Sequence, residues 1–158
     1  MKIFIQSAVI LAVLLGSGLC QAATTTASIP MGVDVPKSCT FSNVSVGITL
    51  FEDGSEAIGD FKMSCNTGYS IIFNTDSSVA TGTGSYVKNI QGNRIPTTTS
   101  VTLWGFTNVI THSWTYIDGG PNYIGPQSGN FKVKLNNPTT ATTEAGVYTD
   151  TLNMNVSY

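Results

Sequence analysis

The sequence predicts an all-β protein, an antiparallel β-sandwich that follows a cleaved leader. Apolar residues alternate with polar ones at period two in several short stretches, which is the pattern of half-buried strands. Gly, Asn, Asp, Ser and Pro separate these stretches at short intervals, as turn residues do. No stretch after the leader carries apolar residues at helical spacing over several turns. Short strands divided by turns in this way favour two packed sheets.

The first 22 residues have the layout of a secretory signal peptide. Lys2 supplies a basic start, residues 8–15 form an apolar run, and small residues stand at Ala22 and Ala23. This apolar run is too short for a membrane-spanning helix and suits a leader that is removed. We therefore predict cleavage after Ala22 and exclude residues 1–22 from the fold.

The charge balance argues against a nucleic-acid partner. The 158-residue chain has seven Lys and Arg residues against nine Asp and Glu residues, and removal of the leader takes one base with it. A nucleic-acid-binding domain normally carries a clear excess of bases. The surface must instead be covered mainly by Thr, Ser, Asn and Gly, which is typical of an extracellular β-protein.

The first stretch behind the leader, residues 25–35, alternates along its whole length. An extended chain places every second side chain on one face, so this stretch predicts a strand with one apolar face. Such a strand needs a partner, either in its own domain or in another molecule. Its odd positions are Thr25, Ala27, Ile29, Met31, Val33 and Val35.

A second alternating stretch covers residues 39–50 and ends in an acidic group. Its later apolar residues share one parity, from Val44 to Leu50. The acidic residues at 52–56 lack the alternating oxygen ligands and the distal Glu of a calcium loop. We predict instead a hairpin turn around Asp53 and Gly54.

Two cysteines remain once the leader, which contains Cys20, is gone. Cys39 opens the second stretch, and Cys65 ends the next alternating stretch at an inward position. In an exported chain the default is that two such cysteines pair. We predict a Cys39–Cys65 disulfide that stabilises the fold by about 3 kcal/mol.

The rest of the chain alternates between strand and turn patterns, and residues 75–85, rich in Ser, Thr and Gly, are predicted to form a loop. The final stretch is the most regular, with Leu152, Met154, Val156 and Tyr158 on one face. Further strands are predicted at residues 57–65, 69–74, 86–90, 101–106, 109–117, 131–135 and 146–158.

Catalytic and cofactor signatures are missing. His112 is the only histidine, and no nucleophile elbow accompanies it. Once the cysteines pair, His112 lacks partners for a zinc site. The carboxylates at Glu52, Asp53 and Glu56 lie on a predicted turn without an apolar pocket to raise a pKa. We predict no enzyme activity, no metal and no cofactor.

Four aromatic residues lie within twenty positions of one another. Exposed aromatic side chains stack on sugars and act as hot spots in protein interfaces, although core packing explains most aromatics of a sandwich. A receptor-binding or carbohydrate-binding face is therefore one interpretation of this group. Its members are Trp104, Trp114, Tyr116 and Tyr123.

Both ends of the chain resemble bacterial chaperone–usher pilus subunits. The resemblance rests on the leader, the alternating stretch before the cysteine in Val33-Asp34-Val35-Pro36-Lys37-Ser38-Cys39, the inward Cys65, and the ending Gly146-Val147-Tyr148-Thr149-Asp150-Thr151 with its alternating strand. The ending is most similar to that of the spore coat protein U and archaic pilin group. Dr-type fimbrial subunits are a close competitor.

This resemblance implies an immunoglobulin-like sandwich that lacks one strand and is completed by a donor strand from a neighbouring subunit. Residues 23–37 would be the donor extension and residues 38–158 the pilin domain. The donor face would be Ala27, Ile29, Met31, Val33 and Val35, and the groove strand would present Leu152, Met154, Val156 and Tyr158.

The same resemblance implies partners and a location. The partners would be neighbouring pilin subunits, a periplasmic chaperone and an outer-membrane usher, with a host receptor or glycan at the surface. The chain would pass through the periplasm to a cell-surface fimbrium. The alternative function is a secreted carbohydrate- or receptor-binding sandwich that does not polymerise.

Overall fold

The computed structural model describes residues 25–112, 114–118 and 124–158, with only the backbone described for residues 114–118. The predicted leader and Tyr123 lie outside these residues. The chain divides into two units, Met1–Asp34 and Val35–Tyr158. Within the first unit, residues 25–34 carry no helix or strand. All of the strands in the described residues belong to the second unit.

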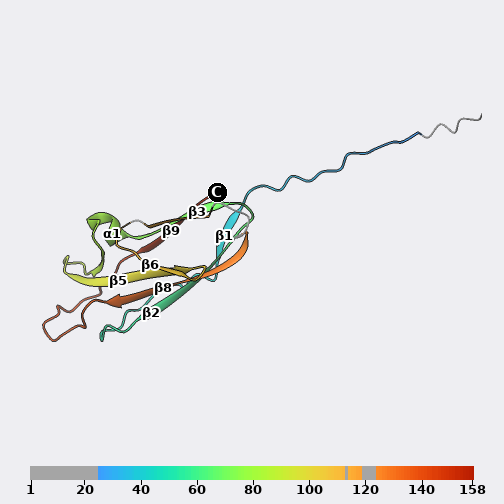
Figure 1. Cartoon of the computed structure of the whole chain (residues 1–158). Helices are drawn as coiled ribbons and strands as arrows, with labels where there is room; N and C mark the ends of the chain where they lie inside the picture. The colour runs from blue at the N-terminus through green and yellow to red at the C-terminus, as the bar shows by residue number, and fades with distance from the viewer. Residues whose placement is uncertain (1–24, 113, 119–123) are drawn as a thin grey trace, which may run out of the picture. The chain divides into compact units, whose positions relative to one another are not determined.

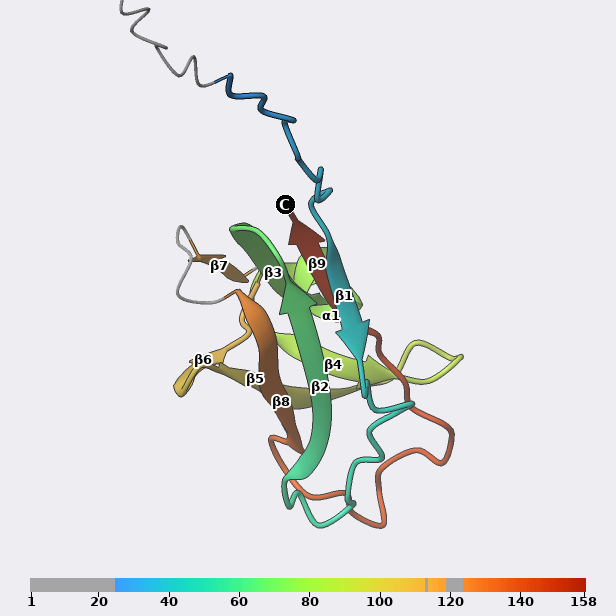
Figure 2. The same ribbon diagram turned by 90° about the vertical axis from the view of Figure 1, so that its right-hand side faces the viewer.

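The second unit is a two-layer antiparallel sandwich, which confirms the predicted fold class (Figures 1 and 2). Its larger sheet has six strands in the order β1-β2-β8-β5-β4, with β6 also paired to β5. The smaller sheet has three strands in the order β7-β3-β9. The strands are β1 (Cys39–Ser42), β2 (Ala57–Cys65), β3 (Tyr69–Thr75), β4 (Ser85–Lys88), β5 (Arg94–Leu103), β6 (Phe106–Val109), β7 (Trp114–Asp118), β8 (Gly125–Leu135) and β9 (Leu152–Ser157).

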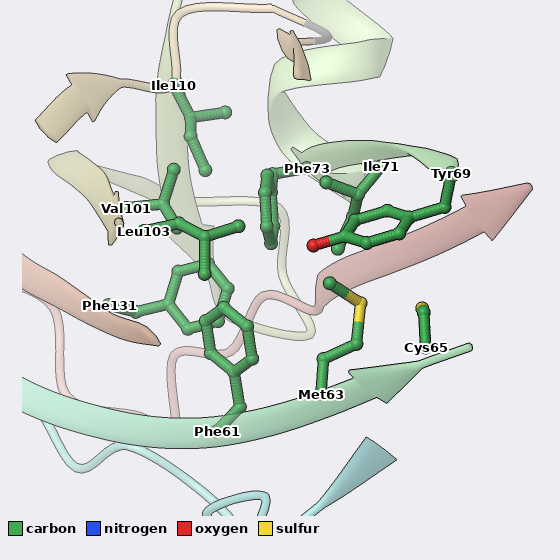
Figure 3. Close-up of a cluster of buried hydrophobic side chains, with 10 residues drawn as sticks. All are labelled: Phe61, Met63, Cys65, Tyr69, Ile71, Phe73, Val101, Leu103, Ile110 and Phe131. Atoms are coloured by element: carbon green, nitrogen blue, oxygen red, sulfur yellow. The ribbon is translucent and has the colours of Figure 1, made fainter. Parts of the chain in front are cut away.

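The core lies between the two sheets (Figure 3). Strand alternation turns every second residue of β2, β5 and β8 toward β3, and these residues are buried. Phe61 is at the centre, with its ring centroid 5.1 Å from that of Phe131 and 5.8 Å from that of Phe73. The buried cluster is Phe61, Met63, Cys65, Tyr69, Ile71, Phe73, Val101, Leu103, Ile110 and Phe131.

The predicted disulfide is present. Cys39 and Cys65 are paired residues at the ends of β1 and β2, and their sulfurs are bonded. The bond closes a segment with a sequence separation of 26 residues. It therefore ties the short edge strand β1 to its neighbour β2 in the larger sheet.

The predicted loop at residues 75–85 is partly wrong, because it contains a short helix, α1 (Asp76–Thr81). Thr75 caps the helix N-terminus by accepting from the Ser78 N–H, and the Ser78 hydroxyl lies 3.0 Å from the Thr75 nitrogen. Gly82 ends the helix with a φ of 69°. Six residues are too few to display a helical period, so only this capping box could have indicated the helix.

The second predicted strand is also shorter than expected. It ends at Ser42, and Asn43 has a φ of +50°, which turns the chain out of the strand. Residues 43–50 alternate in sequence but are not assigned to any strand. A turn is present where the hairpin turn was predicted, since the Gly54 N–H donates to the Phe51 carbonyl over 3.1 Å, but no strand directly precedes it, so it does not join two strands as a hairpin turn does.

No helix in the described part of the chain has the length and hydropathy that a membrane span requires.

Candidate functional site: an open groove between the two sheets

Beside the packed core the sandwich contains an open cavity of about 970 Å³. Along β8 the inward side chains pass from the packed core to the cavity. Phe131 belongs to the core, whereas Val133 and Leu135 line the cavity. On β5, Val101 belongs to the core and Thr99 and Thr97 line the cavity. The larger sheet thus extends beyond the packed core, and its inner face becomes the floor of an open groove.

The first wall of the groove is residues 45–50. Ser45 holds this wall to β2, because its N–H donates to the Asp60 carbonyl and its hydroxyl accepts from the Asp60 N–H, both at 2.9 Å. The Ile48 side chain lies over Gly59, so close that a Cβ at Gly59 would stand 2.6 Å from Ile48 Cδ1. The side chain at position 59 must therefore be absent for this wall to pack.

Residues 46–50, which follow Ser45 in the first wall, have no backbone or side-chain partner for their N–H and C=O groups within the described residues. Unpaired backbone groups next to an apolar floor are costly unless water or another strand satisfies them. This wall is consequently able to accept a strand.

The second wall is residues 145–152, which lead into β9. Thr149 pairs with Lys88 of β4 through two hydrogen bonds of 3.0 Å, so the segment starts along the larger sheet. From Leu152 onward it pairs with β3 in the smaller sheet. β9 is the last strand of that sheet in the described structure, and its outer edge has no strand beside it.

The two walls meet at one end of the sandwich. In Figure 2 the segment between β1 and β2 runs beside the segment between β8 and β9. They are joined where the Thr139 N–H donates to the Glu52 carbonyl over 2.8 Å. The groove is thus closed at this end by a loop contact.

The groove has an apolar part and a hydroxyl-rich part. Ile48, Leu50, Leu135 and Leu152 contribute apolar surface. Around α1, buried hydroxyl groups bond to one another instead, and Thr97 Oγ1 donates to Ser85 Oγ over 2.8 Å. Of the buried hydroxyl-bearing residues, Thr75, Thr97 and Thr99 line the groove, and Ser77, Ser78 and Ser85 lie behind them.

The groove lining carries acids but no Lys or Arg among the described residues. Its acids are Glu52, Glu144 and Asp150. Beside it, the Ser55 backbone N–H, assisted by the Ser55 hydroxyl, lowers the pKa of the exposed Asp53 carboxyl. In residues 25–112, 114–118 and 124–158, no three His, Cys, Asp or Glu residues are grouped as metal ligands would be.

Asp150 fastens the second wall to α1. Its carboxylate accepts from the Ser77 N–H over 3.1 Å and from the Ser77 hydroxyl over 2.5 Å. The Asp76 N–H donates to the Thr151 carbonyl over 3.0 Å, and the Asp76 carboxylate accepts from the Asn153 amide over 2.7 Å. These contacts determine where the chain leaves the larger sheet and enters β9.

We expect Asp150→Ala to lower the free energy of unfolding by about 1 to 3 kcal/mol, because it removes two charge-assisted bonds and leaves Ser77 without its acceptor. Asp150→Asn retains one acceptor oxygen and should cost less. Urea unfolding of the single variants, of Ser77→Ala and of the double variant gives the coupling energy. Strict additivity of the two alanine substitutions would show that these side chains do not act together.

The residues predicted to form the groove strand divide into three groups. Leu152 lines the groove. Met154 and Val156 lie half-buried against the core, on the strand that continues the second wall. Tyr158 is 54% exposed. The predicted single strand over residues 146–158 is therefore correct only from Leu152, with one bridge at Thr149 before it.

The predicted donor residues are highly exposed. Ile29, Met31 and Val33 have exposed fractions of 86%, 95% and 86%, and Val35 has 66%. Ala27 is exposed as well. Four large apolar side chains in eleven residues thus remain in contact with solvent.

The structure describes only one of the four predicted receptor-binding aromatics as a side chain. Trp104 is half-buried against the core, with its ring centroid 5.9 Å from that of Tyr69. It occupies a left-handed backbone conformation, φ +53°, in the turn between β5 and β6. Trp114 and Tyr116 belong to β7 by their backbone, and Tyr123 lies outside the described residues. A receptor-binding face here stays a prediction.

The residues of the first wall, and Thr97 and Thr99 on the groove floor, were not predicted as site residues. Residues 44–50 gave a signal, since their alternation indicates a chain that turns apolar side chains inward. Thr97 and Thr99 gave none, because Thr occupies three consecutive positions, 97–99, and no parity can be distinguished.

Comparisons with known proteins gave similarities only among solved structures. No family model matches the sequence, and no curated protein matches it. One similar chain comes from a chaperone–tip adhesin complex described as vital for synergistic activation of CFA/I fimbriae biogenesis. It has 20% identity and a TM-score of 0.43, and the match covers 75% of this chain and 41% of that one.

A second similar chain comes from the CsuC–CsuE chaperone–tip adhesion subunit pre-assembly complex of the archaic chaperone–usher Csu pili of Acinetobacter baumannii. It has 18% identity and a TM-score of 0.49, and the match covers 78% of this chain and 40% of that one. The chain thus spans about two-fifths of the length of both matched chains.

Proposed function

We propose that this chain is a structural subunit of an extracellular adhesive pilus, assembled by donor-strand exchange. In this assembly the groove of one subunit accepts residues 25–35 of the next. The observation that carries the proposal is the groove itself: its floor is partly apolar, residues 46–50 of the first wall have no backbone partner within the described residues, and the outer edge of β9, which continues the second wall, has no described strand beside it. The same chain carries an exposed stretch with the complementary pattern.

Strand addition explains why both features occur together. A strand placed between residues 46–50 and β9 would satisfy unpaired backbone groups on both of its sides. Its alternate side chains would point into the groove, and in residues 25–35 these are the apolar odd positions. Main-chain bonds would supply affinity, and the match of side chains to the floor would supply specificity.

The proposed contact is heterologous and does not close on itself. The donor stretch and the groove belong to different parts of the chain, so each subunit would offer one donor and one acceptor. Repetition of such a contact adds subunits head to tail and builds a fibre. A dimer with two-fold symmetry would need the same surface on both partners.

An open groove also calls for a partner before assembly. Unpaired strand edges beside apolar surface are sites of aggregation. We propose that a periplasmic chaperone covers the groove after export and that an outer-membrane usher exchanges it for the next subunit's donor stretch.

Two versions of the chain without leader test this proposal. The first lacks residues 23–35, and the second lacks them but carries a copy of residues 25–35 after Tyr158 on a flexible linker. We expect only the second to be a soluble, stable monomer, because its groove is filled in the same molecule. Size-exclusion chromatography and urea unfolding measure both properties.

The matched control is a third version in which neighbouring odd and even residues of the appended copy are exchanged. Its composition is the same, but its polar side chains would face the groove, so we expect no rescue. A truncated chain that is as stable as the fused one would contradict donor-strand exchange. The chain would then be a secreted carbohydrate- or receptor-binding sandwich that does not polymerise.

A further inference from the structure

The outer face of the larger sheet collects most of the positive charge of the chain. Five of the seven Lys and Arg residues stand at outward positions of β2, β4, β5 and β8, opposite in parity to the buried residues of the same strands. We call this surface the basic face. Its bases are Lys62, Lys88, Arg94, Lys132 and Lys134.

Few acids accompany these bases. Asp60 is the acid at an outward position of β2, and Glu56 directly precedes that strand. Glu56 pairs with Lys132 across 3.4 Å, an exposed ion pair. Glu144 lies beside Arg94, since it accepts a hydrogen bond from the Asn93 amide and lines the same pocket as Arg94. The other six of the nine acids belong to other segments of the chain. The basic face is thus positive on a chain whose formal net charge is −2.

The bases are spread along the sheet. Lys132 and Lys134 are alternate residues of the central strand β8, so they lie about 7 Å apart along it. Lys88 and Arg94 pair at the outer end of β4 and β5, and Lys62 stands beside Ser128 toward the other end. The ten residues of β5 alone span about 33 Å.

Hydroxyl and amide groups fill the positions between the bases. Thr98, Ser100 and Thr102 follow one another along the outward side of β5. Asn130 pairs with Thr102 on β8. The Arg94 guanidinium lies 4.4 Å from the Tyr86 ring centroid, so an aromatic ring and a planar cation stand side by side at one end.

We propose that the basic face binds an acidic polysaccharide. Spaced cations would contact its carboxylate or sulfate groups, and Thr and Ser side chains would exchange hydrogen bonds with its sugar hydroxyls. A long, flat face suits an extended polymer better than a compact anion. The face belongs to the side of the sheet away from the groove, so this binding does not depend on how the groove is filled.

A membrane surface is a poorer match for the same charges. Proteins that lie on anionic membranes insert Trp, Phe or Leu side chains beside their bases. The large aliphatic side chains on the outward positions of β2, β5, β6 and β8 are Ile58, at 59% exposed, and Val109, which pairs with Ser100 and is 53% exposed; Phe, Trp and Leu are lacking there.

Binding of the full secreted chain to immobilised polygalacturonate and heparin tests the proposal, with uncharged dextran as the neutral polymer. We expect binding to both acidic polymers at low salt, weakening as salt screens the charges, and none to dextran. Lys134→Gln should weaken binding about two- to five-fold, as loss of one exposed charge contact does. Lys37 lies outside the basic face, so Lys37→Gln, which removes one positive charge there, should leave binding unchanged.

A substitution of opposite sign gives a second test. Glu56→Gln removes an acid from the basic face and releases Lys132 from its ion pair, so binding should strengthen about two-fold or more. Asp53 lies outside the basic face, so Asp53→Asn, which removes one negative charge there, should not change binding.

Three results would overturn the proposal. One is absence of binding to both acidic polymers at low salt. Another is equal weakening by Lys134→Gln and Lys37→Gln, which would indicate an effect of net charge alone. The third is binding to phosphatidylglycerol vesicles or to duplex DNA that exceeds binding to both polysaccharides, because the partner would then be of another class.

Discussion

Ile29→Asp together with Val33→Asp is expected to abolish head-to-tail association of the chain. Both positions lie on the apolar parity of the donor stretch and are 86% exposed in the single chain. Burial of an aliphatic side chain of this size contributes about 1.5 to 3 kcal/mol, and a charge placed on an apolar floor opposes insertion further. The loss for two positions corresponds to a decrease in association of about 100-fold or more. Analytical ultracentrifugation of the secreted chain measures it.

The matched control changes Thr26 and Ser28 to Asp. These residues have the opposite parity, so in the proposed complex they face away from the groove. The same two negative charges should leave association within about three-fold of the unsubstituted chain, since exposed charges contribute little. Equal loss in both variants would mean that charge, rather than the apolar face, controls association.

Folding of the acceptor domain has to be measured separately in this experiment. The Ile29 and Val33 variants can be made in a chain that also carries an unsubstituted copy of residues 25–35 after Tyr158. We expect the urea unfolding midpoint of that chain to be unchanged, because its groove is filled by the appended copy. A lower midpoint would show that Ile29 and Val33 stabilise their own domain, which would contradict the donor role.

Phe61→Ala is expected to lower the free energy of unfolding by about 3 to 5 kcal/mol, the range found for large aromatic residues in cores. Phe61 is 1% exposed and packs against the ring of Phe131 in the neighbouring strand and against the ring of Phe73 in the opposite sheet. Its ring also fills the space over Gly129, where a Cβ would stand 2.3 Å from it. The surrounding side chains therefore cannot close the cavity that alanine leaves.

Ile58→Ala is the control for Phe61 within the same strand. Ile58 has the outward parity and is 59% exposed, so its truncation should change the free energy of unfolding by no more than about 0.5 kcal/mol. Urea unfolding of both variants in the same filled-groove background gives the comparison. Similar losses for the two would show that β2 does not have the inward and outward faces described.

The parity of the strands was predictable because neighbouring residues determine it. Phe61, Met63 and Cys65 share one side of an extended chain wherever that chain is placed, and the structure buries all three. The disulfide was predictable for a similar reason, since an exported chain with two cysteines has one pairing available. The helix at Asp76–Thr81 was missed because its stability depends on a capping box and on contacts with Asp150.

Residues 46–50 of the first wall show what sequence alternation alone cannot predict. Their alternation indicated a strand with one apolar face, but only Ile48, which lies over Gly59, and Leu50 are half-buried, whereas Val46 is fully exposed. A strand also requires backbone partners, however, and those come from residues distant in sequence. Without a neighbouring backbone to hold the stretch extended, alternation in sequence does not by itself turn every apolar side chain inward.

The sequence by itself determined the all-β class, the inward face of most strands, the cysteine pair and the apolar parity of residues 25–35. All of these follow from local alternation and composition. Only the tertiary structure decided where the sandwich stays open, because that depends on how far the larger sheet extends past the smaller one. The same holds for the basic face: five bases scattered through the sequence gather on one surface only after strand pairing brings β2, β8, β5 and β4 side by side.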